Sequence, residues 1–212
     1  MRHTPEHAVE DEAVVRRLIA ENPWATIVSE HGGELVASHY PVLLDERSED
    51  GRGPLAVVTH LGRPDDQVHG LGGGREVLLI VAGVHGYVSP SWYSELGVRA
   101  PTWNFSVAHC HGVPEILTPE ENVRVLTRLV AHFERHVEEP LYLEPEVAAR
   151  LAPGTVGLRI PIARFTCKVK MSQDKDPRSQ AQVLEALRRP GPYRHDVLAD
   201  EMERALAEYK RS

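Results

Sequence analysis

The sequence is most informative at residues 87–93, Tyr-Val-Ser-Pro-Ser-Trp-Tyr, and at residues 101–105, Pro-Thr-Trp-Asn-Phe. These two stretches hold five of the chain's 12 Phe, Trp and Tyr residues, mixed with serine, threonine and asparagine and with two prolines. Flat apolar rings beside short polar groups are typical of a site for a planar ligand. A buried aromatic corner with capped turns would have the same composition, so both interpretations stay open on these residues alone.

The composition argues against several classes of protein. The chain has 212 residues, enough for one full domain, and its formal net charge of -7 argues against nucleic-acid binding. No apolar run approaches the roughly 18 residues that span a bilayer, and the N-terminus has no signal-peptide pattern. We therefore expect a cytoplasmic protein that binds neither nucleic acid nor membrane. Two cysteines, Cys110 and Cys167, are too few for a disulfide framework or a zinc site.

Apolar and alternating runs predict a core that is mainly β. The expected strands are residues 25–29, 34–44, 55–60, 76–84 and 105–117. A hairpin turn is expected at 31–33 and a glycine-rich loop at 62–75. A long strand at 154–171 changes its alternation near residues 163–164, which predicts a bulge or bend there. Strands joined by tight turns, with few helices between them, predict an α+β fold with a β-barrel-like core and peripheral helices.

The clearest helix signal is Thr118-Pro119-Glu120-Glu121, which combines a cap, a proline at the first position and a glutamate at the third. This helix is expected to reach about His136, with its inward residues being Val123, Leu126, Leu129, Val130 and Phe133. Other helices are expected at residues 9–20, 144–151, 179–189 and 195–210. We expect residues 1–188 to form one domain and residues 189–212 to be its C-terminal helical extension.

Histidine is the one residue type in excess, with 12 in the chain. Several of them lie beside glycine or aromatic residues, as His60, His69 and His85 do. Most histidines in proteins are solvated or structural, so each one alone is a weak candidate for a ligand. The excess as a whole favours a metal or haem site.

Five segments in order resemble one family, the PaiB family of FMN-binding negative transcriptional regulators. They are residues 22–23, 59–63, 87–93, 101–105 and 168–174, the last reading Lys-Val-Lys-Met-Ser-Gln-Asp. The resemblance covers nearly the whole chain, to about residue 188. It implies the FMN-binding split-barrel fold and a homodimer.

The chain departs from the family pattern after the histidine motif. Typical members continue with an alanine, an arginine and an asparagine-rich segment that ends in Gln-Trp. Here Gly62 replaces the alanine, Asp65 and Asp66 replace asparagine, and the tryptophan is absent. Two carboxylates near an anionic flavin would weaken its binding, so the departure argues against FMN.

A divergent branch of the family binds haem b and makes L-piperazic acid from N5-hydroxy-L-ornithine by forming a nitrogen–nitrogen bond. The altered loop, the excess of histidine and the arginine-rich, lysine-poor composition resemble that branch. The resemblance implies a haem-dependent cyclase whose partner is an N-hydroxylated diamino acid. Three alternatives remain: an FMN-binding split-barrel oxidoreductase, a PaiB-type transcriptional regulator, and a haem-degrading or haem-binding protein.

On this interpretation His60, at the end of a buried strand, is the axial iron ligand, with His85 and His109 as alternatives. A strand-end histidine bonded to the backbone is the simpler interpretation of His60. By resemblance, the candidate cofactor-binding residues are His60, Arg63, Trp92, Trp103, Lys168, Lys170 and Ser172. The candidate catalytic residues are Asp65 and Asp66, which could meet the substrate's ammonium group or act as acid and base, together with Tyr93. Without the family, the two lysines would be the exposed side of a strand and the two aspartates solvated loop residues.

Overall fold

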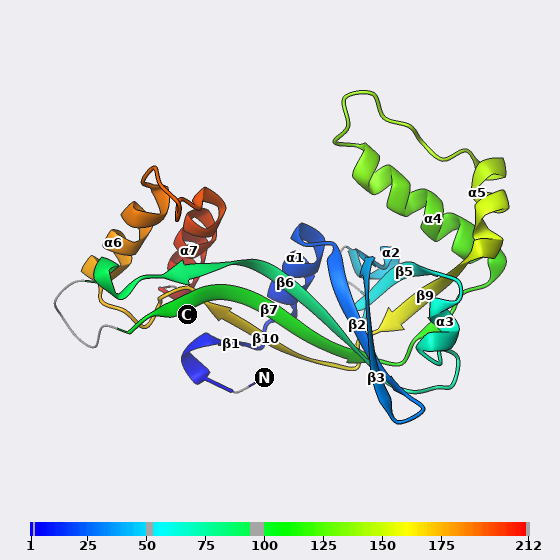
Figure 1. Ribbon diagram of the computed structural model, residues 1–212, viewed down its shortest axis with the longest axis horizontal. Helices are drawn as coiled ribbons and strands as arrows, with labels where there is room; N and C mark the ends of the chain where they lie inside the picture. Colours follow the sequence, from blue (N-terminus) through cyan, green and yellow to red (C-terminus); the bar gives the residue numbers. More distant parts are fainter. Residues whose placement is uncertain (2, 50–52, 94–99, 211–212) are drawn as a thin grey trace. The chain divides into compact units, whose positions relative to one another are not determined.

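A computed structural model describes residues 1, 3–49, 53–93 and 100–210 (Figure 1). The chain divides into two compact units. Unit 1 comprises Met1–Glu10, Ala82–Ala108 and Thr166–Ser212. Unit 2 comprises Asp11–Val81 and His109–Phe165. Strands of antiparallel sheets and peripheral helices occur in both units, which confirms the expected α+β class.

Unit 2 begins with a helix and a hairpin. Helix α1 (Glu12–Glu21) leads into β2 (Trp24–His31) and β3 (Glu34–Pro41), which pair antiparallel. Gly32 and Gly33 form the turn between them with φ angles of 64° and 85°, a region that favours glycine. Strand β6 (Val77–Val88) pairs with the other edge of β2, so the local strand order is β6-β2-β3.

A four-stranded antiparallel sheet in unit 2 carries the histidine motif. Its strand order is β4-β5-β9-β8. The strands are β4 (Leu43–Leu44), β5 (Ala56–Gly62), β9 (Thr155–Pro161) and β8 (Glu115–Ile116). In the register of β5 and β9, His60 stands opposite Gly157.

Helix α4 (Pro119–Glu134) covers one face of this sheet. Its Val125 and Leu129 form a buried cluster with Leu43 and Val58 of the sheet. The capping box is present, because Thr118 accepts a hydrogen bond from the Glu121 amide and Glu121 accepts one from the Thr118 amide. Short elements complete the unit: α2 (Glu46–Glu49), α3 (Asp65–Val68), α5 (Pro145–Leu151) and η3 (Ala152–Gly154).

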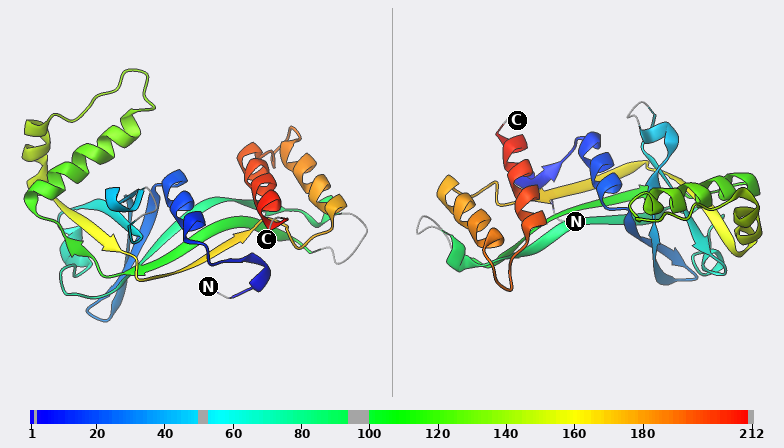
Figure 2. Two further views of the ribbon diagram at one scale, coloured as in Figure 1. Left: turned by 180° about the vertical axis from the view of Figure 1, so that it is seen from behind. Right: turned by 90° about the horizontal axis from the view of Figure 1, so that it is seen from above.

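Unit 1 contains strands in the order β1-β10-β7-β6 and two C-terminal helices (Figure 2). The short β1 (Ala8–Val9), after the 3-10 turn η1 (Pro5–His7), pairs with β10 (Arg164–Lys170). The next strand in this order is β7 (Thr102–Gly112). Helices α6 (Pro177–Arg188) and α7 (Asp196–Tyr209) pack on each other. Strand β6 approaches α7 so closely that a Cβ on Gly86 would lie 2.6 Å from Leu198 Cδ2.

The structure corrects several expected elements. The first helix starts at Glu12 rather than residue 9, because the Asp11 carboxylate caps it by accepting from the Ala13 amide at 2.9 Å. The strand expected over 34–44 divides into β3 and β4, and the loop expected over 62–75 contains α3. Phe133 is 42% exposed, so its predicted inward position is wrong.

Other expectations are confirmed. The long strand 154–171 breaks between β9 and β10, next to the predicted bend at residues 163–164. The helices expected near 144–151, 179–189 and 195–210 are α5, α6 and α7. Within the described ranges, no helix combines the length and apolarity needed to cross a membrane.

Candidate functional site

His60 lies near the end of β5 in unit 2, on the sheet face that α4 covers. Residues two apart on a strand share a face, and Val58 packs against α4 from this strand. The His60 side chain is only partly exposed, its Nδ1 atom is buried, and Nδ1 has no hydrogen-bond partner in the described part of the chain. Burial lowers the pKa of His60, which keeps the imidazole neutral near pH 7. The simpler interpretation, a ring bonded to the backbone through Nδ1, is therefore not what the geometry shows.

The loop after β5 pairs its arginine with its own carboxylate. Arg63 donates from Nη1 to Asp66 Oδ2 at 2.8 Å, and the Asp66 side chain is only 13% exposed. The second oxygen of this carboxylate, Asp66 Oδ1, is buried and has no described partner. The carboxylate of Asp66, three residues along the chain, thus partly neutralises the positive charge of Arg63.

Asp65 is held by the hairpin β2–β3. Its Oδ2 accepts from Tyr40 OH at 2.6 Å and from Ser38 Oγ at 2.9 Å. These two hydrogen bonds lower the pKa of Asp65, and the bond from Tyr40 has the larger effect. Burial and the bond to Asp65 raise the pKa of Tyr40 to about 12. Asp65 is therefore ionised and is held in place by two hydrogen bonds at the start of α3. Its catalytic role stays a prediction.

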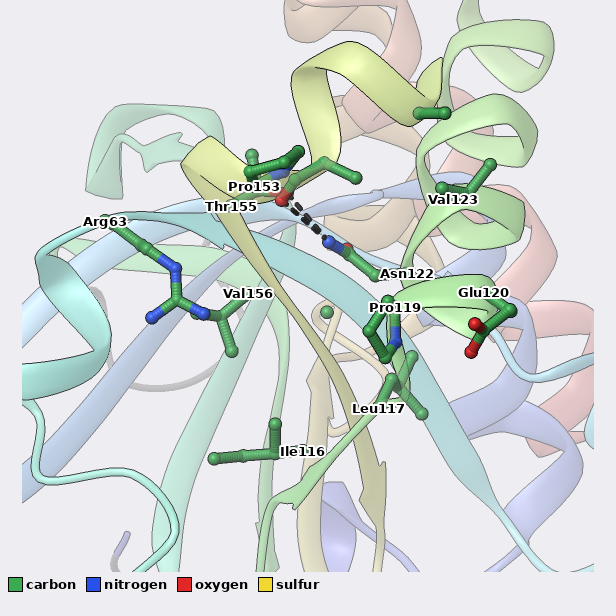
Figure 3. A pocket seen from close by; sticks show the side chains of 13 residues that line it. Arg63, Ile116, Leu117, Pro119, Glu120, Asn122, Val123, Pro153, Thr155 and Val156 are labelled. Carbon is green, nitrogen blue, oxygen red and sulfur yellow. Dashed lines mark hydrogen bonds between the residues drawn. The ribbon is translucent and has the colours of Figure 1, made fainter. Parts of the chain in front are cut away.

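A cavity of about 480 Å³ lies beside α4 in the same unit (Figure 3). Arg63 and Glu120 line it, together with the buried side chain of Asn122. Its other lining residues are Ile116, Leu117, Pro119, Val123, Ala149, Ala152, Pro153, Thr155, Val156 and Gly157. No sequence pattern predicts this cavity, because its lining comes from segments whose contact depends on the tertiary fold.

Unit 1 brings two of the family motifs into contact. Lys170, on β10, donates a short hydrogen bond to Thr102 Oγ1. Ser172 donates to Asn104 Oδ1 at 3.0 Å, and Asn104 is completely buried. Burial lowers the pKa of Lys170, with Asp174 opposing the effect. The motif residues 101–105 and 168–174 therefore form one cluster.

His7 belongs to this cluster and was missed from the sequence. The pairing of β1 with β10 places it beside Lys168, whose Nζ donates to Thr4 Oγ1 at 2.9 Å. His7 is 7% exposed, and its buried Nδ1 has no partner among the described residues. Burial lowers its pKa, and the nearby Lys170 lowers it further while Asp174 raises it. Only the strand pairing, which joins residues far apart in sequence, could have revealed this histidine.

The aromatic residues of the opening motif split into two environments. Tyr93 is buried, its hydroxyl has no described partner, and Lys175 Nζ lies 5.9 Å from its ring centroid. Burial raises the pKa of Tyr93. Trp92 and Trp103 instead each lie edge-on to Tyr87, at ring-centroid distances of 6.5 and 6.3 Å. Trp103 is 53% exposed, as a ring that receives a planar ligand would be.

The alternative histidine ligands, His85 and His109, differ in their surroundings. His85 is exposed in unit 1, with Nδ1 3.1 Å from the Gly83 carbonyl and its ring 6.2 Å from that of Trp103. His109, in β7, has its pKa lowered by burial. Among the described residues no group of three or more His, Cys, Asp or Glu is placed to hold a metal ion.

The family follows from comparison with known proteins. A family model described as "Putative FMN-binding domain" matches residues 1–164. The chain is 27% identical over 172 residues to the Protease synthase and sporulation protein PAI 2 of Bacillus subtilis (strain 168), with 80% of each chain covered. The chain belongs to the PaiB family. The predicted membership of the PaiB family is thereby confirmed.

Two solved structures show that the PaiB fold of this chain is the expected split barrel. One is the FAD and haem binding protein of Mycobacterium smegmatis, with a TM-score of 0.57, 17% identity, and 77% of this chain and 73% of that chain covered. The other is the flavocytochrome Anf3 of Azotobacter vinelandii, with a TM-score of 0.56, 15% identity, and 77% and 69% covered. At these identities the similarity concerns the fold alone.

Proposed function

We propose that this PaiB-family protein is a haem-dependent enzyme and that His60 is the protein ligand of the iron. The observation that carries the proposal is the state of the His60 ring, which is partly exposed and which its lowered pKa keeps neutral. Haem iron needs one neutral imidazole from the protein, since the porphyrin supplies four nitrogens. A donor set with a single histidine therefore fits haem better than a free metal ion.

The charges of the loop after β5 support haem over FMN. Arg63, which by resemblance would meet the flavin phosphate, is bonded to Asp66. Asp65 adds a second carboxylate within the same loop, and its lowered pKa keeps it ionised. A phosphate with up to two negative charges is repelled more by these carboxylates than a singly charged propionate is.

The reaction that we propose is the dehydrative cyclisation of N5-hydroxy-L-ornithine to L-piperazic acid. The α-amine nitrogen bonds to the δ-nitrogen, the N–O bond breaks, and the hydroxyl leaves as water with a proton, so no oxidant or reductant is consumed. When bound, haem iron would supply Lewis acidity toward the N–O group. The chain must hold the substrate folded, keep the attacking amine unprotonated and deliver a proton to the departing oxygen.

The three predicted catalytic residues differ in their hydrogen-bond partners. Asp66 has a buried oxygen without a partner, so it can accept a proton or an N–H bond, whereas Asp65 already accepts two hydrogen bonds on one oxygen. Tyr93, with its raised pKa and unpartnered hydroxyl, stays protonated and can donate. We therefore assign the acceptor role to Asp66, whereas the catalytic role of Tyr93, which belongs to unit 1, stays a prediction.

An FMN-binding oxidoreductase is the second candidate. It is favoured by the description of the family model and by the cationic pair Lys168 and Lys170 near Ser172. The buried, pKa-lowered Lys170 could meet an anionic group of either cofactor.

Cofactor preference and turnover test the proposal together. The purified chain is titrated with hemin and, separately, with FMN, and then incubated with N5-hydroxy-L-ornithine. We expect saturable hemin binding with a sharp Soret band, weak FMN binding, and a product lighter than the substrate by one water. Tight FMN binding with no Soret band would replace this proposal by the oxidoreductase, and hemin binding without turnover would remove the cyclase assignment.

A further inference from the structure

The loop after β5, residues 63–75, is attached to the hairpin β2–β3 by contacts that include two histidines. One is His69 of the loop, and the other is His31 at the end of β2. The loop contains helix α3 and a glycine-rich stretch, and it carries the charged residues Arg63 and Asp66 of the candidate site. The contacts that hold the loop on the hairpin therefore also determine where these charges lie.

His69 makes the buried contact between the loop and the hairpin. It directly follows α3 and is 2% exposed, and its Nδ1 lies 2.8 Å from Oγ of the buried Ser29 in β2. Its Nε2 is buried and has no hydrogen-bond partner in the described part of the chain. A hydroxyl is a neutral partner, so neither ring nitrogen has a described bond to a carboxylate that would offset a positive charge.

Asp65, at the start of α3, is the charged group that acts on His69. Burial lowers the pKa of His69, whereas the charge of Asp65 raises it. The pKa of His69 is lowered on balance, so the effect of burial is the larger. The Asp65 carboxylate itself is bonded to Tyr40 and Ser38 of the hairpin. His69 is therefore neutral at pH 7 in the closed arrangement of the loop.

His31 makes an exposed contact with the other end of the loop. Its Nδ1 lies 2.9 Å from Nη2 of Arg75. A guanidinium can only donate, so Nδ1 of His31 must be the unprotonated acceptor. The ring also packs on Gly70, where an added Cβ would lie 2.2 Å from Nδ1. Glu30 Oε2 lies 3.6 Å from Arg75 Nη1 and is the carboxylate of this contact.

We propose that His31 and His69 form an acid-sensitive latch, which holds the loop after β5 on the hairpin β2–β3 while both rings are neutral. Protonation of His69 places a charge in a buried position that Asp65 offsets only in part. Protonation of His31 removes the acceptor of Arg75 and sets two cations against each other, with Glu30 as a partial compensation. Acid therefore releases the loop together with the charged residues of the candidate site.

The pH range of the latch follows from the open loop. A histidine in the open loop has an ordinary pKa of about 6.5. Burial lowers the pKa of His69 in the closed loop. Closure is therefore fully favourable above the open-loop pKa and weakens as the pH falls below it. For one histidine that stays unprotonated when closed, the equilibrium constant for opening rises about tenfold for each pH unit below this value.

Hydrogen exchange of the full chain at pH 8 and pH 5, corrected for the intrinsic rate and read by mass spectrometry, tests the latch. The loop contains bonded amides, since the His69 amide donates to the Asp65 carbonyl and the Leu71 amide to the Asp66 carbonyl, both at 2.9 Å. We expect the protection of these amides to fall at least about tenfold from pH 8 to pH 5 while α4 keeps its protection. Unchanged protection of the loop, or an equal loss in α4, would overturn the inference.

Asparagine variants separate the latch from other effects of acid. His69→Asn and His31→Asn retain a polar side chain for Ser29 and Arg75 but cannot be protonated. We expect the double variant to keep the loop protected at pH 5. His39→Asn is the matched control, because His39 belongs to the same hairpin but bonds to Thr26. This control should lose protection as the wild type does, and a double variant that behaves like the control would contradict the latch.

Nuclear magnetic resonance of the wild type decides the matter if the double variant does not fold. The nitrogen chemical shifts of the imidazole rings report the protonation of each histidine. We expect His69 to stay neutral down to the pH at which the loop loses its protection. Protonation of His69 in a chain whose loop stays protected would overturn the inference. Neither experiment uses hemin or substrate, so the latch is tested independently of the proposed function.

Discussion

The hydroxyl of Ser172 donates a hydrogen bond to Asn104 Oδ1 at 3.0 Å and so joins two motifs that lie 68 residues apart in the sequence. Asn104 is completely buried, and Ser172 is 2% exposed with a φ angle of 60°, in the left-handed region. A residue other than glycine in this region costs about 1–2 kcal/mol. The sheet of unit 1 therefore holds Ser172 in a strained conformation that keeps its hydroxyl on Asn104.

The first prediction concerns this bond. Ser172→Ala leaves Asn104 Oδ1 without its donor and keeps the strained φ angle, so the free energy of unfolding should fall by about 1–3 kcal/mol. Ser172→Gly loses the same bond but relieves the strain, so it should lose about 1 kcal/mol less. Urea denaturation measures both. Equal stability of Ser172→Ala and wild type would show that the bond is absent in solution.

The second prediction concerns Arg63 and Asp66. Asp66→Asn removes the carboxylate that compensates the Arg63 guanidinium and one negative charge from the loop. FMN should bind several-fold tighter to this variant than to the wild type, on the order of 1 kcal/mol for a partly screened charge. Fluorescence quenching of FMN gives the affinity, and Glu138→Gln, a charge change far along the sequence, is the control. Unchanged FMN affinity in Asp66→Asn would mean that the loop does not meet the flavin phosphate.

The third prediction concerns pH. The hydrogen bonds from Tyr40 and Ser38 lower the pKa of Asp65 below its ordinary value. A carboxyl group whose pKa is lower in the folded than in the unfolded chain stabilises the fold. This stabilisation is fully present above the unfolded-state pKa, near 4, and is lost as the pH falls through the folded-state pKa. Tyr40→Phe should therefore be less stable than wild type at pH 7, and the difference should shrink at acid pH. Thermal denaturation between neutral and acid pH checks this, and a difference that grows on acidification would contradict it.

The fourth prediction concerns the start of α4, whose first turn borders the cavity. Thr118→Ala removes the side chain that accepts from the Glu121 amide, and should lower the free energy of unfolding by about 1 kcal/mol. Thr118→Ser keeps the acceptor and should stay close to wild type. The measurement is the denaturant concentration at the unfolding midpoint of wild type, Thr118→Ala and Thr118→Ser. Equal midpoints for Thr118→Ala and Thr118→Ser would show that the cap contributes nothing.

Local signals in the sequence predicted much of the fold. The capped start of α4 needs only residues 118–121, and the break between β9 and β10 follows from the change of alternation near residue 163. The hairpin at Gly32-Gly33 needs only two residues with positive φ. Each of these features is set by neighbours in the chain, which a sequence displays directly.

Features that depend on contacts between residues far apart in the sequence could not be predicted. Leu43 and Leu44 look like the end of a strand, but they pair with β5 in another sheet. The partner of Lys168 is Thr4, 164 residues away in the sequence. Asn122 looks like an ordinary polar residue of a helix, and only the fold shows that its amide is buried with one atom unpaired.

The roles of the candidate site residues stay predictions. The structure shows which of them meet: the motifs at 101–105 and 168–174 are joined by hydrogen bonds, and His60 lies in the other unit. From the sequence alone Asp65 and Asp66 are equal candidates, whereas the structure gives them different partners. That difference arises from the hairpin residues Ser38 and Tyr40, which only the folded chain brings to Asp65.

The central claim, that His60 ligates haem iron, is tested most directly by the absorption spectrum of the hemin-reconstituted chain with His60 intact and replaced by alanine. His85→Ala serves as the control, since His85 is the alternative ligand and its Nδ1 lies 3.1 Å from the Gly83 carbonyl. The account predicts that His60→Ala loses or strongly shifts the Soret band while His85→Ala keeps it. A His60→Ala protein that binds hemin with the wild-type spectrum would contradict the account.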